Sequence, residues 1–594
     1  MSTIALDNYL TSHGLILQET GDITKGRKVI STRNHERGHV LITSQPLGTI
    51  PLPSRRQEIC NYCFRKPQQP TSLQRCSQCK TAYFCDKACF KNAWLTYHQY
   101  VCRPNSATQQ LVDDDDQDAL DLEMLERVAL NCWRYNKRKL NQQVQLETIS
   151  TEEQRQEENV DATMEAFYSL MDHKQSQPKH TIQRFSQLSQ KALSRVYLKD
   201  SGLTTNELVQ CLCRFQCNNF GVHDDHLFTI GEGTYPVASL INHSCRPNAI
   251  VMFDGALLCV VAIENIQPDQ EVTISYVDAA HDRSHRQSTL FGKYFFHCDC
   301  VRCLDDTNIY GEIDSLLGNE ASDWDRAQAL LMENNDNTLR SKILQQVNDW
   351  DLLEMCRLYD RKHDAIPDPT KPLDLATYTH FVIQFFAPYL WSVNNPSIRL
   401  VNERSPSSAA AGSSSRSSTP PPLPSPPSRG LSHFDDPLPH LARPMVPDSY
   451  QAILQKVMSM IRSYPVDPDV VPFHLTTLSA STQLLYDEMN AGNWRNAVKL
   501  GMYVLIQYCW IYPPYHPILA QHILLLAKCS WNSIIKSELL GDGKALETVY
   551  ERGVRRWLML SKEALACCVG KKGDQWRELI ELEWIFLREQ KLKE

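Results

Sequence analysis

Alternating apolar and polar positions predict short β-strands in the middle of the chain. The apolar runs at 249–253 and 257–263 flank the dipeptide Asp254-Gly255. Asp-Gly between two such runs is typical of a tight hairpin turn, because both turn residues must accept unusual backbone angles. The pattern therefore predicts an antiparallel hairpin over residues 249–263.

Two further stretches carry a strand-like pattern. Near the N-terminus, residues 24–30 and 40–42 predict a short strand, a turn and a second strand, after a helix-like lead. Later in the chain, Val272, Ile274 and Tyr276 recur at every second position and would share one face of a strand. Together with the hairpin, these stretches predict a small β-rich core.

Longer helical patterns surround this core. Residues 103–225 are expected to be mainly helical, although 150–159 is polar and charged without an apolar stripe and is expected to be mobile. Residues 306–594 have an all-helical pattern with one interruption. That interruption, residues 402–436, is rich in Ser and Pro, so we expect it to be disordered with polyproline-like character.

The C-terminal part contains one stretch that is long and apolar enough to span a membrane. Residues 500–527 contain no charged side chain, but Pro513, Pro514 and Pro517 interrupt them. Two core helices joined by a Pro-rich turn explain this composition better than a membrane span. A preceding helix pair, with its turn at Gly492, resembles tetratricopeptide-type hairpins without a clean 34-residue period.

Bulk composition narrows the class of protein. At 594 residues the chain is expected to form several domains, and its 22% charged and 42% hydrophobic residues are ordinary for a soluble globular protein. The net charge of −8 argues against general nucleic-acid binding, which needs a basic face. The N-terminal residues show no basic n-region followed by an apolar run, so no secretory signal is expected.

Eleven of the 21 cysteines stand at metal-ligand spacings, and the remaining ten are interpreted as reduced intracellular thiols. Eight soft ligands follow one another in four pairs: Cys60 and Cys63, Cys76 and Cys79, Cys85 and Cys89, and His98 and Cys102. Eight such ligands make two tetrahedral sites with no open position, as structural zinc requires. These two metal sites could serve only to stabilise the fold.

A third metal site is predicted from a second cysteine cluster. Cys298, Cys300 and Cys303 leave a tetrahedral zinc one ligand short. Cys245, which lies between two strand-like runs, is the natural fourth ligand. The two segments would then be drawn together around one metal ion.

These motifs resemble two known families of domain. Residues 60–102 resemble the MYND zinc finger; the terminal His-x3-Cys favours it over a RING-type finger, whose histidine usually lies earlier. The resemblance implies interleaved sites, one made by Cys60, Cys63, Cys85 and Cys89, the other by Cys76, Cys79, His98 and Cys102. Residues 242–248, Asn-His-Ser-Cys-Arg-Pro-Asn, resemble the signature of SET-domain lysine methyltransferases.

Taken together, the chain resembles the SMYD family, most specifically in residues 60–102, 231–248, 269–278 and 294–303. The resemblance implies an α+β multidomain protein: a SET-domain β-fold with a pseudoknot, an inserted MYND finger and an all-α, tetratricopeptide-like C-terminal domain. The implied domains are an N-terminal SET part (1–59), the finger (60–102), a helical SET insert (103–225), the SET core (226–280), a post-SET zinc segment (281–305) and the C-terminal domain (306–594).

The family's activity is protein-lysine N-methylation with S-adenosylmethionine. The resemblance implies that the cofactor is held by Lys25, Gly26, Arg27, Asn218, Ser239, Leu240, Asn242, His243, Tyr276 and Phe296. In the N-terminal cofactor turn the family has Gly-x-Gly. Here Gly26 fills the first position and Lys28 the second, and a residue with a Cβ does not readily adopt φ > 0.

Tyr276 matches the family's catalytic tyrosine, although a tyrosine that ends a strand is usually structural. In the implied reaction a neutral lysine amine attacks the sulfonium methyl in line. Tyr276 would orient the amine, and three zinc ions would be structural because every site is saturated with ligands. The alternative is a SET/MYND scaffold that binds protein partners and has little or no activity.

The resemblance also suggests partners. The substrate would be a lysine of a histone tail or of another protein, and a proline-rich peptide could bind the finger. We expect a monomer in the cytoplasm and nucleus, without membrane association or direct nucleic-acid binding.

Overall fold

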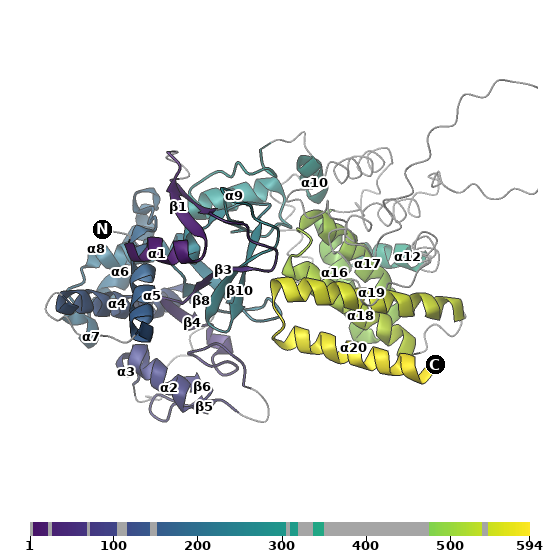
Figure 1. Cartoon of the computed structure of the whole chain (residues 1–594), viewed down its shortest axis with the longest axis horizontal. Helices are drawn as coiled ribbons and strands as arrows, with labels where there is room; N and C mark the ends of the chain where they lie inside the picture. The colour runs from purple at the N-terminus through teal and green to yellow at the C-terminus, as the bar shows by residue number, and fades with distance from the viewer. Residues whose placement is uncertain are drawn as a thin grey trace, which may run out of the picture. The chain divides into compact units, whose positions relative to one another are not determined.

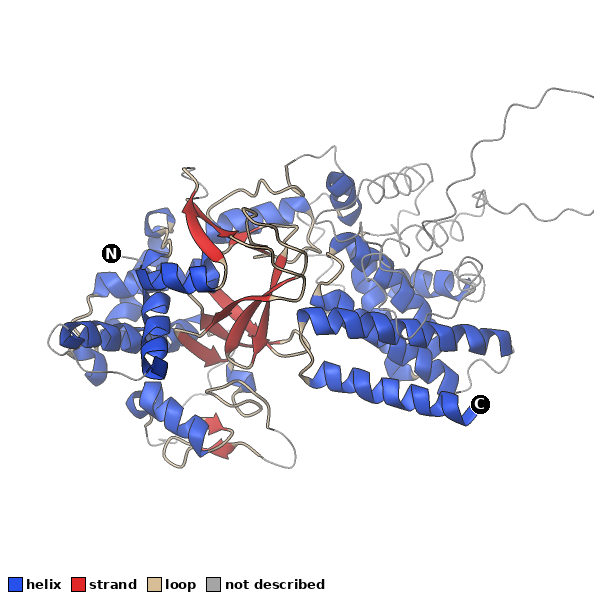
Figure 2. Cartoon of the chain, in the orientation of Figure 1, coloured by secondary structure: helices blue, strands red, loops and turns tan. Residues whose placement is uncertain are grey.

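The computed structural model describes residues 4–21, 26–67, 72–103, 116–142, 151–304, 309–318, 337–349, 474–536 and 544–593. The chain divides into two compact units. The first is Met1–Val277 with Gln287–Cys298, and the second is Asp278–Arg286 with Asp299–Glu594. The described strands all lie in the first unit, whereas the described part of the second unit is built mainly of helices (Figures 1 and 2).

The strands of the first unit form several small sheets. The two three-stranded sheets have the orders β10-β11-β3 and β4-β8-β7, and the two-stranded ones are β1-β2, β5-β6 and β12-β9. The strands are β1 Leu15–Glu19, β2 Arg27–Ser31, β3 Val40–Ser44, β4 Gly48–Pro51, β5 Gln74–Arg75, β6 Tyr83–Phe84, β7 Asn219–His223, β8 Thr229–Thr234, β9 Asn242–His243, β10 Ala249–Asp254, β11 Leu257–Ala262 and β12 Thr273–Ile274.

The predicted hairpin is confirmed. Strands β10 and β11 pair antiparallel, and their register ends with Asp254 opposite Leu257. Gly255 in the turn has φ of +64°, a left-handed conformation that glycine adopts without strain. Near the N-terminus both predicted strands are present as β2 and β3; β2 pairs with β1, and β3 pairs with β11.

A short parallel pair connects two segments that are distant in sequence. In β9 and β12, Asn242 lies opposite Thr273 and His243 opposite Ile274. The residues just before β12 also bond to β2, through the Val272 N–H and the Val29 carbonyl at 2.9 Å. The signature segment is therefore held against the strand that leads to Tyr276.

The helices of the first unit are α1 Ile4–Ser12, α2 Lys87–Ala93, α3 Gln99–Val101, α4 Gln117–Gln142, α5 Thr151–Ser169, α6 Lys179–Leu193, α7 Val196–Lys199 and α8 Thr205–Asn218. Helix α9 Arg283–Tyr294 contains residues of both units. Helix α8 begins with a capping box in which Thr204 and Glu207 bond reciprocally. Helix α5 includes residues 151–159, in line with the mainly helical pattern expected for 103–225, and the mobility expected for 150–159 stays a prediction.

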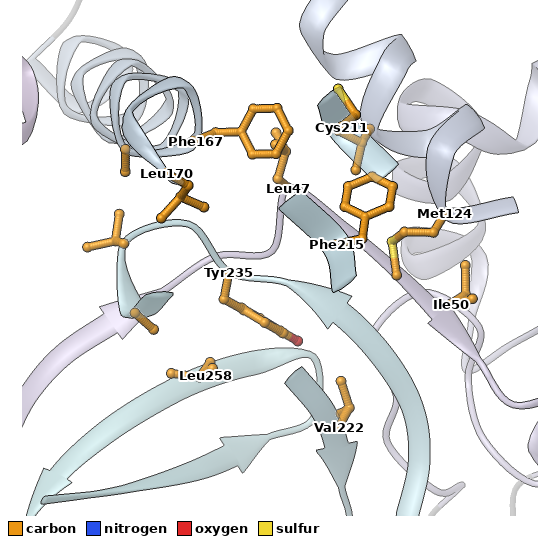
Figure 3. Close-up of a cluster of buried hydrophobic side chains, with 14 of the residues drawn as sticks. Leu47, Ile50, Met124, Phe167, Leu170, Cys211, Phe215, Val222, Tyr235 and Leu258 are labelled. Atoms are coloured by element: carbon orange, nitrogen blue, oxygen red, sulfur yellow. The ribbon is translucent and has the colours of Figure 1, made fainter. Parts of the chain in front are cut away.

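The core of the first unit joins helices to sheets (Figure 3). Phe167 from α5 and Phe215 from α8 belong to one buried cluster with Tyr235 and Leu258. The Tyr235 hydroxyl donates to the Ala256 carbonyl at 2.8 Å, so the polar end of this fully buried ring has a partner. The cluster packs the sheets against helices α5 and α8.

The second unit contains, among its described residues, α10 Ile309–Leu317, α12 Asn337–Asp349, α16 Leu475–Ala491, α17 Trp494–Ile511, α18 Pro517–Ile535, α19 Lys544–Cys568 and α20 Asp574–Lys593. Both expected turns are present. Gly492 ends α16 with φ of +80°, and residues 512–516 connect α17 to α18. The tetratricopeptide-like arrangement stays a prediction.

Helix α18 is long and apolar enough to cross a membrane by composition, but 61% of its apolar window is buried inside the structure. Burial to this extent fits the core helix expected from the sequence. The Ser/Pro-rich segment at 402–436 lies outside the described residues.

Candidate functional site

The finger brings its eight ligands into the two interleaved groups that the resemblance implied. Cys60, Cys63, Cys85 and Cys89 form one group, and Cys76, Cys79, His98 and Cys102 form the other. Within each group the ligand atoms lie within 4.8 Å of one another. Asp86 caps helix α2 by accepting from the Cys89 N–H at 2.8 Å, and this fixes the helical turn that presents Cys89.

A third group consists of Cys245, Cys298, Cys300 and Cys303, again within 4.8 Å. This is the set of four that the sequence predicted. Four thiol ligands per group, or three with a histidine, suit a tetrahedral structural zinc and leave no position open for a substrate. The three groups could hold zinc, and the chemistry proposed below uses no metal step.

A buried ionic network contacts Cys303 of the third group. The Arg286 guanidinium donates to the Cys303 Sγ at 3.7 Å and to both carboxylate oxygens of Asp314 at 2.9 and 2.7 Å. Arg302 donates to the same carboxylate at 2.7 Å. The side chains of Arg286 and Arg302 are 0% and 2% exposed, so one carboxylate is shared by two buried cations.

Tyr276 is held at both ends by residues 241 and 243, at the start of the signature segment. Its N–H donates to His243 Nδ1 at 2.9 Å, and its hydroxyl donates to the Ile241 carbonyl at 2.6 Å. The ring centroid lies 4.8 Å from that of Tyr294 and 6.4 Å from that of Phe296. Burial, reinforced by Tyr294, raises the pKa of the Tyr276 phenol well above its ordinary value. The phenol therefore keeps its proton at neutral pH.

Asn242 connects the signature segment to the N-terminal turn. Its side-chain amide donates to the Arg27 carbonyl at 2.7 Å and to Glu271 Oε1 at 2.9 Å. Gly26 has φ of +61°, as expected of the first glycine position, and Lys25 lies outside the described residues. Lys28 lies in β2 opposite Gln18 and is not among the residues with positive φ. Lys28 therefore does not adopt the positive φ that a glycine at this position would allow.

The other residues implied for the cofactor lie around this segment. The Ser239 hydroxyl donates to the Asn218 carbonyl at 3.0 Å, and the Asn218 amide donates to the Arg214 carbonyl at 2.9 Å. Leu240 is buried. The ring of Phe296 lies 6.1 Å from that of His243. These contacts bring Asn218 next to Ser239, and Phe296 next to His243; their role in holding the cofactor stays a prediction.

Sequence reasoning missed several residues of the site. Tyr294 stands two positions before Phe296 in an aromatic run, which was a usable signal. Glu271 lies next to the predicted strand but has no motif of its own. The pairing of Arg286 with Asp314 joins residues 28 positions apart and left no pattern in the sequence.

Comparison with known proteins supports the resemblance. Residues 26–277 match the model of the SET domain, and the finger at 60–102 lies inside the matched range. Similar proteins include the histone-lysine N-methyltransferase ASHR1 of Arabidopsis thaliana, 28% identical over 47% of this chain and 53% of the relative.

The N-lysine methyltransferase SMYD2 of Homo sapiens is 25% identical over 58% of this chain and 73% of the relative. The histone-lysine N-methyltransferase SMYD3 of Mus musculus is 26% identical over 50% of this chain and 62% of the relative. The predicted resemblance to the SMYD family is thereby confirmed. Several of these matches, that to ASHR1 among them, span little more than half of the relative's length.

Proposed function

We propose that this protein is an S-adenosylmethionine-dependent protein-lysine N-methyltransferase. The observation that carries the proposal is the double anchoring of Tyr276 on the segment 241–243, inside an aromatic cluster. The SET-domain match over residues 26–277 and the names of the relatives support it.

The geometry of Tyr276 supports a role as hydrogen-bond acceptor. Its one hydroxyl proton is committed to the Ile241 carbonyl, so the phenol oxygen can accept an N–H from a lysine amine. Such a bond would orient the amine so that its lone pair points along the line of attack. The raised pKa of Tyr276 argues against a role as general base.

The aromatic residues around Tyr276 would prepare the amine. A lysine has an ordinary pKa near ~10.4, and it must lose its proton before it can attack. Tyr294 and Phe296 would exclude water around it, and desolvation favours the neutral amine. The bound cofactor supplies the methyl group as a sulfonium, whose positive charge also favours a neutral neighbour.

The finer parts of the proposal concern metals, partners and location. Zinc in the three ligand groups would be structural. The substrate would be a protein lysine, in a histone or another protein, and the finger could bind a proline-rich peptide. We further propose a tetratricopeptide-like C-terminal domain and a monomer that acts in the cytoplasm and nucleus.

A direct test combines binding and transfer. Isothermal titration with S-adenosylmethionine should show binding, and radiolabelled methyl groups should pass to lysines of histones or of a cell extract. Binding without transfer, over a broad set of protein substrates, would favour the scaffold. Absence of both would overturn the proposal.

A further inference from the structure

The imidazole of His243 has a defined hydrogen-bond partner at each ring nitrogen. Nδ1 lies 2.9 Å from the backbone nitrogen of Tyr276, and Nε2 lies 3.2 Å from Cys245 Sγ. A backbone N–H can only donate, so Nδ1 must be the acceptor and carries no proton. In the neutral ring the proton is then on Nε2, where it points at the sulfur.

The bond to Tyr276 continues a backbone ladder that is otherwise very short. The β9–β12 ladder pairs only two residues on each strand, and the Ser244 N–H then donates to the Ile274 carbonyl at 2.9 Å. Tyr276 lies beyond the end of β12. There the His243 ring takes the place of a backbone carbonyl as acceptor for the Tyr276 N–H.

The bond to Cys245 reaches a residue of the third ligand group. Cys245 is 1% exposed and lies within 4.8 Å of Cys298, Cys300 and Cys303 at the ligand atoms. A thiolate that binds metal is stabilised by an N–H donor, and such a donor also fixes the orientation of the group that supplies it. The metal group and the tyrosine therefore share one imidazole.

We propose that His243 is a positioning residue that couples the Cys245 metal group to the backbone of Tyr276. The thiolate fixes the rotation and the tautomer of the ring, and the ring fixes the N–H of the residue whose hydroxyl faces the substrate amine. The catalytic consequence rests on the proposed methyltransferase function. The coupling itself does not, because it is a property of the folded protein.

Two substitutions remove the two hydrogen bonds of His243 one at a time. In His243→Asn the amide oxygen can replace Nδ1 as acceptor from Tyr276, but the side chain is too short to reach the sulfur. In His243→Gln the amide nitrogen can replace Nε2 as donor to Cys245, while the acceptor position is lost. His180 is exposed on α6, so His180→Asn and His180→Gln serve as matched controls.

Two readouts are independent of methyl transfer. Zinc release to a chromogenic chelator reports on the ligand group, and hydrogen exchange of a peptide that contains residues 272–280 reports on the Tyr276 amide. We expect His243→Asn to speed the release of one zinc by ~10-fold or more and to keep the amide protected. We expect His243→Gln to do the opposite, raising amide exchange by ~10-fold with little change in zinc release.

Activity gives a third readout. If the wild type transfers methyl groups, His243→Gln should lower kcat by ~10-fold or more with little change in the KM for the protein substrate, and His243→Asn should lower it less. If the wild type transfers none, the proposed function fails, and zinc release and exchange still decide the coupling. Unchanged zinc release in His243→Asn, or unchanged amide exchange in His243→Gln, would overturn the proposal.

Discussion

Substitution of Asp314 tests how much the buried ionic network contributes to the free energy of unfolding. Its carboxylate is 5% exposed and accepts from both Arg286 and Arg302. In Asp314→Asn, the two buried guanidinium groups would face a neutral amide. Removing one partner of a buried ion pair costs ~3–5 kcal/mol, because the remaining charge is left uncompensated. This is a large part of the ~5–15 kcal/mol that stabilises a typical domain.

The same carboxylate should make stability depend on pH. Burial alone would raise the pKa of Asp314, but Arg302 and Arg286 outweigh it, so the net pKa lies below the ordinary value. A carboxyl whose pKa is lower in the folded state stabilises the fold at any pH above its unfolded pKa of ~3.9. This stabilisation is lost as the pH falls through the folded pKa. The wild type should therefore lose more stability on acidification than Asp314→Asn.

Urea denaturation of the whole chain, followed by circular dichroism between pH 3 and pH 7, measures both effects. The control is Asp574→Asn, which removes an exposed partner of Arg577 in the same unit and should cost at most ~1 kcal/mol. An Asp314→Asn variant as stable as this control at pH 7 would refute the reasoning about the buried network.

Three further predictions concern single features of the structure. Cys245→Ser should lower the zinc content from about three to about two ions per chain, measured by atomic emission; unchanged content would exclude Cys245 as a ligand. Gly492→Ala should destabilise the second unit by ~1 kcal/mol in denaturant melts, because φ is +80° there although the space is open; a neutral effect would show that the turn adjusts. Thr204→Ala should cost ~1 kcal/mol by removing the cap of α8, and Thr204→Ser should retain most of it.

Features set by neighbouring residues could be predicted from the sequence. The hairpin turn at Asp254-Gly255 and the helix end at Gly492 depend on backbone preferences within a few residues, and both are confirmed. The metal groups could also be predicted, because paired soft ligands have few other uses at such spacing, and the missing fourth ligand pointed to Cys245.

Features set by contacts between distant residues could not be predicted. The β9–β12 ladder is two residues long, and such a short pair has no hydrophobic pattern of its own. The polar stretch at 151–159 showed no apolar stripe, yet it forms the first part of α5, whose later residues, such as Phe167, are buried. The side chain of His243 bonds to residues that only the folded chain brings into position. The motif therefore indicated a cofactor residue without showing its bonds to Tyr276 and Cys245.

Tyr276 is the residue that we propose directs methyl transfer to a protein lysine. The most direct measurement is transfer from radiolabelled S-adenosylmethionine to proteins of a cell extract, with methyl-lysine identified by mass spectrometry, for the wild type and for Tyr276→Phe. We expect methyl-lysine with the wild type and a loss of ~100-fold or more with Tyr276→Phe, at unchanged zinc content and circular dichroism. Undiminished transfer by Tyr276→Phe would contradict it.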